Sequence, residues 1–163
     1  MLLPELEEAL NEQLNKELYS AYLYLAMASY FEANIFSGMA KWMQIQAKEE
    51  LEHGMKYYNY IFQRGGSVSL KTIDAPPVSW DSPLLAFEDA LNHEKSITSD
   101  IHQLLNLAMS HSDHATVQFL QWFVSEQVEE EASASTIVQK LKRIGDDNTA
   151  GLMIIDRDLS VRA

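Results

Sequence analysis

Apolar residues recur every three or four positions along four long stretches of the chain, which is the spacing of one face of an α-helix. Glycine and proline are scarce within these stretches and gather between them, where helices end and begin. The pattern predicts helices over residues about 5–34, 37–64, 83–110 and 114–144, with a short fifth over 147–160. Since strand-like alternation is confined to a short connector near residue 70, we expect an all-α fold in a single domain, 1–163.

The lengths of the connections predict how the four long helices are arranged. The first and third connections are short, so the helices on either side of each should pair as antiparallel hairpins. The middle connection has roughly 17 residues and could span a whole helix at about 3.3 Å per residue. We therefore expect a four-helix bundle with one long crossover connection along its side and a short C-terminal helix.

Polar residues interrupt every apolar stripe near its middle. The interruptions are single glutamates on the first and third stripes and pairs three positions apart on the second and fourth: Glu17, Glu94, Glu50 with His53, and Gln127 with Glu130. Glu17 and Glu50 are as far apart along the chain as Glu94 and Gln127, so the two hairpins repeat one spacing. Folding of the hairpins would bring all six residues to one level of the core.

This polar level has the chemistry of a metal site. Four carboxylates buried together repel one another unless a cation lies between them, and no lysine or arginine occupies the stripes near the interruptions. Two divalent ions would balance four carboxylates, and oxygen ligands with one imidazole favour iron or manganese. The chain has no cysteine, which excludes thiolate ligands, cysteine nucleophiles and disulfides.

Composition excludes several kinds of partner. The chain has 12 basic and 24 acidic residues, for a net charge of −12, so it lacks the general basic surface that binds nucleic acid. No apolar run approaches the roughly 18 residues of a membrane-spanning helix. The first residues lack the basic and apolar regions of a signal peptide. We expect a cytoplasmic protein with neither nucleic acid nor membrane as partner.

Four motifs give the chain a family resemblance. They are the segment 17–24 (ELYSAYLY), the segment 49–53 (EELEH), the pair His93-Glu94, and the segment 119–123 (FLQWF) followed by 126–131 (EQVEEE). With these motifs the chain resembles the non-haem ferritins of bacteria and archaea along essentially its whole length. The resemblance implies a ferritin-like di-iron domain that forms a homo-oligomeric cage of 24 subunits. Such a cage oxidises Fe(II) with O2 and stores the ferric mineral inside.

The resemblance also assigns the site residues. The ferroxidase centre would comprise Glu17, Tyr24, Glu50, His53, Glu94, Gln127 and Glu130. The first iron would be held by Glu17, Glu50 and His53, with Glu50 bridging to a second iron on Glu94 and Glu130. Gln127 would sit beside the pair, and Tyr24 would be hydrogen-bonded to the site. A third, adjacent iron site would use Glu130 together with Glu49, Glu126 and Glu129.

Haem is not expected. Bacterioferritins bind haem through a methionine just before the histidine of the second helix, where this chain has Leu51 and Glu52. They also carry a second Glu-x-x-His pair on the fourth helix, where this chain has Gln127 and Glu130. Two other functions stay open: a discrete di-iron or di-manganese oxidase or peroxidase without mineral storage, and a metal-free helical interaction protein.

The remaining polar and apolar residues carry weaker expectations. Glu131 falls off the inward stripe and should be solvated. Four further histidines lack partners at matching spacing and should lie at the surface or in turns: His93, His102, His111 and His114. The last helix has an apolar run, 152–155, that a closed bundle need not bury, so we expect it at a subunit interface.

Overall fold

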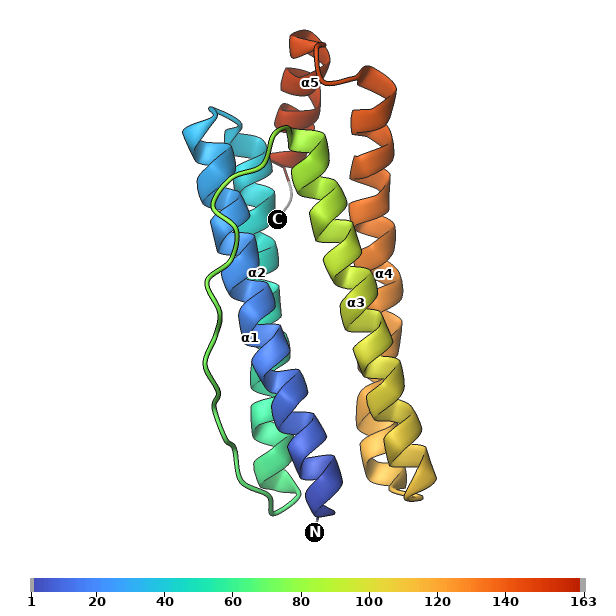
Figure 1. The fold of residues 1–163 in the computed structure, drawn as a ribbon. Coiled ribbons are helices and arrows are strands. Elements are labelled where there is room, and N and C mark those ends of the chain that lie inside the picture. Colours follow the sequence, from blue (N-terminus) through green and yellow to red (C-terminus); the bar gives the residue numbers. More distant parts are fainter. Residues whose placement is uncertain (1, 162–163) are drawn as a thin grey trace.

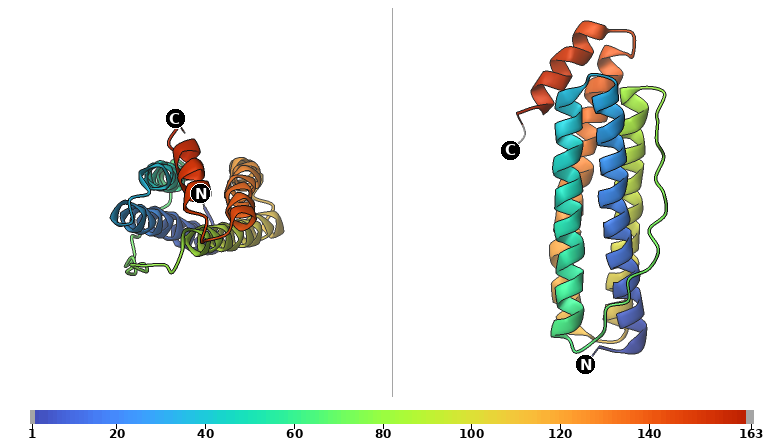
Figure 2. Two further views of the ribbon diagram at one scale, coloured as in Figure 1. Left: turned by 90° about the horizontal axis from the view of Figure 1, so that it is seen from above. Right: turned by 90° about the vertical axis from the view of Figure 1, so that its left-hand side faces the viewer.

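A computed structural model describes residues 2–161 and shows five α-helices over that range (Figure 1). They are α1 (Pro4–Ala33), α2 (Ser37–Gln63), α3 (Pro83–Ser110), α4 (His114–Ile144) and α5 (Thr149–Leu159). The first four form an elongated bundle, and α5 packs at one end of it (Figure 2). This architecture confirms the predicted all-α bundle with one long crossover and a short fifth helix. None of these helices is long and apolar enough to cross a membrane.

The crossover between α2 and α3 runs beside α1 from one end of the bundle to the other (Figure 1). It makes α2 and α3 begin at the same end, so they run parallel, while α1–α2 and α3–α4 are antiparallel hairpins. Asn11 of α1 fixes the start of the crossover, because its side chain accepts from the Ser69 amide at 2.7 Å and donates to the Ser67 carbonyl at 3.0 Å.

Both hairpins turn in the same way. After α1, the Phe36 amide donates to the Phe31 carbonyl at 2.9 Å, with Ile35 between them at a φ of 63°. After α3, the Asp113 amide donates to the Ala108 carbonyl at 2.9 Å, and Ser112 takes a φ of 53°. In each case a single left-handed residue lets the chain satisfy the last carbonyls of the helix, which allows a short turn.

The core consists of two apolar clusters. The cluster nearer α5 includes Tyr24, Phe31 and Phe87, and the cluster at the opposite end includes Leu14 and Phe123. The hairpins meet along α1 and α3, whereas Cα atoms of α2 and α4 do not come within 8 Å of one another anywhere in these two fully described helices. Long side chains from α2 and α4 therefore fill the space between these helices.

The fifth helix is fastened to the start of α2. Asp156 accepts a hydrogen bond from the Met39 amide at 2.8 Å, so a side chain of α5 satisfies one of the free amides of the first turn of α2. Gly38 lies against the Asp156 carbonyl so closely that an added Cβ would be 1.8 Å from its oxygen. Leu152 and Ile155 are buried in this contact, while the apolar side chains between them on the sequence remain largely exposed.

Candidate metal centre

Six polar side chains from α1 to α4 converge between the two apolar clusters, and each is at most 6% exposed: Glu17, Glu50, His53, Glu94, Gln127 and Glu130. One ligand atom each from Glu17, Glu50 and His53 lies within 4.8 Å of the others, a spacing that could hold a metal ion. A second group with the same spacing joins His53 to Glu126 and Glu130. The polar interruptions of the four apolar stripes thus meet at one level, as their spacing predicts.

His53 lies at the junction of these two groups. Its Nδ1 is 3.6 Å from Glu50 Oε2, one helical turn earlier on α2, and its Nε2 is 3.9 Å from Glu126 Oε1 on α4. The ring is held edge-on by two aromatic neighbours, with centroids 5.4 Å from Trp122 and 6.1 Å from Phe123. Packing on α4 therefore fixes the direction in which the imidazole nitrogens point.

Glu94 is held at both of its oxygens. The Tyr24 hydroxyl donates to Oε1, and the Gln127 amide donates to Oε2 at 3.0 Å. Gln127 also reaches the Glu94 carbonyl at 3.2 Å, which ties α4 to α3 at this level. Tyr24 and Gln127 therefore restrict how this carboxylate can turn.

Two buried glutamines also bind the carboxylates, and neither was predicted from the sequence. Gln13 donates to Glu17 Oε1 at 2.7 Å, and Gln46 donates to Glu130 Oε2 at 2.7 Å. The sequence does hold a signal for them. Gln13 lies one helical turn before Glu17, and Gln46 lies one helical turn before Glu50, so the glutamines repeat the spacing of the glutamates. Extending the repeat by that turn would have found both.

The three acids predicted for an adjacent third site differ in burial. Glu126 is half-buried and beside His53, Glu49 is half-buried next to Glu50 in the sequence, and Glu129 is exposed. The charge of Glu49 acts on Glu130, since it helps to raise the pKa of that carboxyl. Glu49 and Glu126 thus lie close to the buried centre, whereas Glu129 is exposed to solvent on α4.

Two expectations from the sequence are wrong. His93 is not a surface or turn residue: it is half-buried between α1 and α3, with Nε2 2.7 Å from Ser20 Oγ and its ring against Tyr19 and Tyr24. Glu131 is half-buried and accepts a hydrogen bond from Thr98 at 2.6 Å. Both residues lie beside the inward stripe, where neighbouring helices meet. The periodicity marks only the stripe itself as buried, so it predicts that positions beside it are exposed.

Burial and mutual repulsion raise the pKa of all four carboxyls and so favour their protonated forms. Burial, followed by the charge of Glu50, raises the pKa of Glu17 well above its ordinary value, although the Gln13 hydrogen bond opposes this rise. Burial and the charges of Glu94 and Glu130 likewise raise the pKa of Glu50. Burial raises the pKa of Glu94, and burial with the charge of Glu94 raises the pKa of Glu130 to about 7. A divalent cation would replace these protons and relieve the repulsion.

Without divalent cations, the native protein is expected to lose stability as the pH rises from about 5 to 7. The native state keeps the Glu130 proton up to about pH 7, whereas the unfolded chain releases it near 4.5, so the native state binds more protons in this interval. Glu130 alone then lowers the free energy of unfolding by about 3 kcal/mol. Thermal unfolding as a function of pH measures the decline, which Glu130→Gln or saturating Zn(II) should flatten. Coincident wild-type and Glu130→Gln profiles would contradict the prediction.

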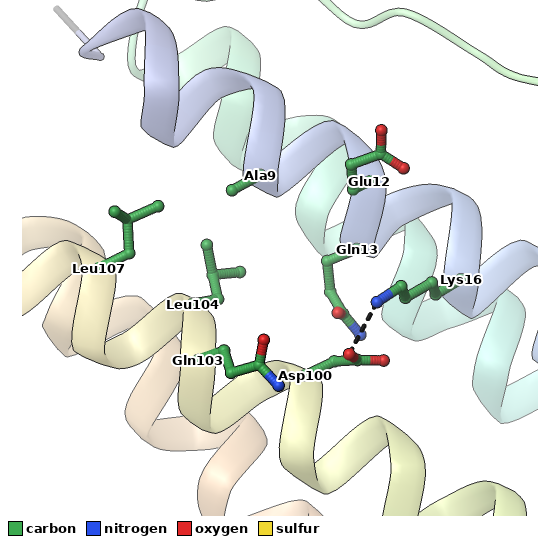
Figure 3. Close-up of a pocket in the computed structure, with 8 residues that line it drawn as sticks. All are labelled: Ala9, Glu12, Gln13, Lys16, Asp100, Gln103, Leu104 and Leu107. Atoms are coloured by element: carbon green, nitrogen blue, oxygen red, sulfur yellow. Dashed lines mark ion pairs between the residues drawn. The ribbon is translucent and has the colours of Figure 1, made fainter.

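A pocket of about 350 Å³ opens between α1 and α3 on the Gln13 side of the centre. An ion pair between Lys16 of α1 and Asp100 of α3, at 2.8 Å, crosses it, and Gln13 points from α1 toward Asp100 beside this pair (Figure 3). Because the Gln13 amide also holds Glu17, one side chain connects this surface pocket to the buried carboxylates.

Comparisons with known proteins agree with this geometry. A family model described as a ferritin-like domain matches residues 7–144. A protein of Bacteroides fragilis (strain 638R) named bacterial non-heme ferritin is 43% identical over 162 residues, which covers 99% of this chain and 100% of the relative. A Staphylococcus aureus (strain MRSA252) protein of the same name is 42% identical over 162 residues, covering 99% and 97%.

A solved structure extends the likeness to the backbone. The chain superposes on an open-pore ferritin from the hyperthermophilic archaeon Archaeoglobus fulgidus with a TM-score of 0.98, at 50% identity and over 100% of both chains. The similarity therefore includes the bundle, the crossover and the short last helix.

Proposed function

Because this chain belongs to the ferritin family, we propose that it oxidises Fe(II) with O2 at the buried carboxylate–histidine centre and stores the ferric product inside a homo-oligomeric cage. The burial of four carboxylates beside one imidazole carries this proposal, with ligand atoms of Glu17, Glu50 and Glu130 each within 4.8 Å of a nitrogen of His53. Within residues 2–161, no lysine or arginine forms an ion pair with any of the four. Metal cations are then the charges that suit the site.

The proposed roles follow from position. Glu17 and His53 would bind one Fe(II), Glu94 and Glu130 would bind the other, and Glu50 would bridge the two. A buried oxygen of Glu50, Oε1, has no hydrogen-bond partner among residues 2–161, which supports its use as a metal ligand. Anionic oxygen ligands favour Fe(III) over Fe(II), and two adjacent Fe(II) ions supply the two electrons that reduce O2 to the level of peroxide.

Other residues would support these ligands. Tyr24 and Gln127 would orient Glu94, since their hydrogen bonds occupy both of its oxygens. Glu49, Glu126 and Glu129 would form a third iron site that shares Glu130. The position of Glu126, 3.9 Å from His53, supports such a site directly beside the proposed iron pair.

The surface of α5 supports assembly into a cage. Met153 is 65% exposed and Ile154 is 53% exposed, although both are apolar and lie next to buried residues of the same helix. Exposed apolar faces of this kind are typical of subunit interfaces. We propose that α5 contributes to the contacts of a 24-subunit particle.

Size-exclusion chromatography after addition of Fe(II) in air tests the proposal. The expected result is a very large particle that co-elutes with many irons per chain. A small oligomer that retains only about two metal ions per chain would instead indicate a discrete di-iron or di-manganese oxidase. A protein that binds neither Fe(II) nor Zn(II) would indicate a helical interaction protein and overturn the proposal.

A further inference from the structure

The two helices of the first hairpin share more than their glutamates. Both carry the pattern Gln-x3-Glu-x6-Tyr, formed by Gln13, Glu17 and Tyr24 in α1 and by Gln46, Glu50 and Tyr57 in α2. Because α1 and α2 are antiparallel, the two tyrosines lie on opposite sides of the carboxylates. Tyr24 belongs to the apolar cluster nearer α5, and Tyr57 belongs to the other cluster.

The glutamines and tyrosines of this pattern donate hydrogen bonds to the carboxylates, with one exception. Gln13 donates to Glu17, Gln46 donates to Glu130, and Tyr24 donates to Glu94. The hydroxyl of Tyr57 has no hydrogen-bond partner among residues 2–161, although the side chain is fully buried. A buried hydroxyl without a partner destabilises the native state, so the position calls for an acceptor.

Tyr57 lies one helical turn after Gly54, the residue of α2 that packs against Glu17. Its ring stacks on Phe123 with centroids 4.2 Å apart, and Phe123 also contacts His53. One turn earlier on α2, Gly54 faces Glu17, since a Cβ added there would be 3.6 Å from the Glu17 Cβ. Burial, followed by the charge of Glu17, raises the pKa of the Tyr57 phenol well above its ordinary value. The turn of α2 that carries Tyr57 therefore packs beside Glu17.

Glu94 shows what such a tyrosine does at this centre. One of its oxygens accepts from a phenol, that of Tyr24, and the other accepts from an amide, that of Gln127. Glu17 accepts a hydrogen bond from an amide, that of Gln13, and from no phenol among residues 2–161. Tyr57 follows Glu50 on α2 at the spacing with which Tyr24 follows Glu17 on α1.

We propose that Tyr57 is a positioning residue of the metal centre, whose hydroxyl donates a hydrogen bond to the Glu17 carboxylate when Glu17 binds a metal ion. The bond would fix the rotation of Glu17 as Tyr24 fixes that of Glu94. This inference rests on the proposed function, because it assigns Glu17 to the metal. It also explains why a phenol is buried with no partner of its own.

Titration of the assembled protein with Co(II), which reports ligand geometry through its visible absorption, tests the proposal. In Tyr57→Phe, we expect the affinity for one of two Co(II) ions to fall about tenfold and the absorption of that ion to change. The variant without metal should be at least as stable as wild type, because it loses an unpartnered hydroxyl. Co(II) affinity and absorption identical to wild type would overturn the proposal.

Tyr58→Phe is the matched control. Tyr58 is the next residue on α2, is half-buried, and packs on Phe62 with centroids 5.2 Å apart. Its substitution should leave the binding of both Co(II) ions unchanged. Co(II) binding does not require oxidation, so wild type that binds two Co(II) ions but leaves Fe(II) unoxidised in air would refute the proposed function and not this inference.

Discussion

Replacing Glu50 with alanine is expected to reduce the initial rate of Fe(II) oxidation by at least about 100-fold, and His53→Ala should have a similar effect. Glu50 is the proposed bridge, and its removal also breaks the group of three ligand atoms formed with Glu17 and His53. Stopped-flow absorbance of the ferric product, at fewer than two Fe(II) per chain, measures the rate of the centre rather than that of mineral growth.

Glu52→Ala is the control for this prediction. Glu52 follows Glu50 closely on α2 and is exposed, so its substitution makes the same change of side chain without removing a buried ligand. Its oxidation rate should match wild type. Rapid oxidation preserved in Glu50→Ala or His53→Ala would contradict the assignment of the centre.

Replacing Gly38 with alanine is expected to detach α5 and prevent assembly of the proposed cage. The new Cβ would lie 1.8 Å from the Asp156 carbonyl oxygen, which is far inside van der Waals contact and involves backbone on both sides. Relief of the clash requires α5 to move, and the hydrogen bond from the Met39 amide to Asp156 is then lost. The variant should elute as a small species while circular dichroism still shows a helical bundle.

Gly54→Ala provides the comparison within the same helix. There the nearest atom to an added Cβ is a Leu18 methyl at 3.4 Å, an ordinary contact with a flexible side chain. Alanine also favours helix over glycine by up to about 1 kcal/mol, so this variant should assemble and unfold much like wild type. Normal assembly of Gly38→Ala would show that the contact between α5 and α2 is dispensable.

The sequence predicts the architecture because helical periodicity, connection lengths and helix-ending residues act locally. The bounds of the last helix are less well predicted. The sequence pattern predicts this helix over 147–160, whereas α5 is Thr149–Leu159, with Asn148 as its cap: the Asn148 side chain accepts from the Gly151 amide at 2.9 Å. The apolar period defines the middle of a helix, but its first and last residues depend on cap geometry that the period does not contain.

The centre is predictable for a similar reason, but its supporting hydrogen bonds are not. A carboxylate on an apolar stripe stands out, whereas a glutamine there does not. Gln13 and Gln46 each precede a glutamate by one helical turn, yet Gln13 binds its own helical neighbour and Gln46 crosses to Glu130 on α4. Identical spacing gives different partners because the choice depends on the rotation and separation of the helices.

The separation of α2 and α4 has a mechanical consequence. The hairpins pack backbone to backbone along α1 and α3, while side chains such as Gln46 and Glu130 bridge α2 and α4. A change in the spacing of ligands between α2 and α4 can therefore be met by rotation of side chains, without a shift of either helix. Under the proposed function, the ligands of α2 and α4 would draw closer in this way as Fe(II) becomes the smaller Fe(III).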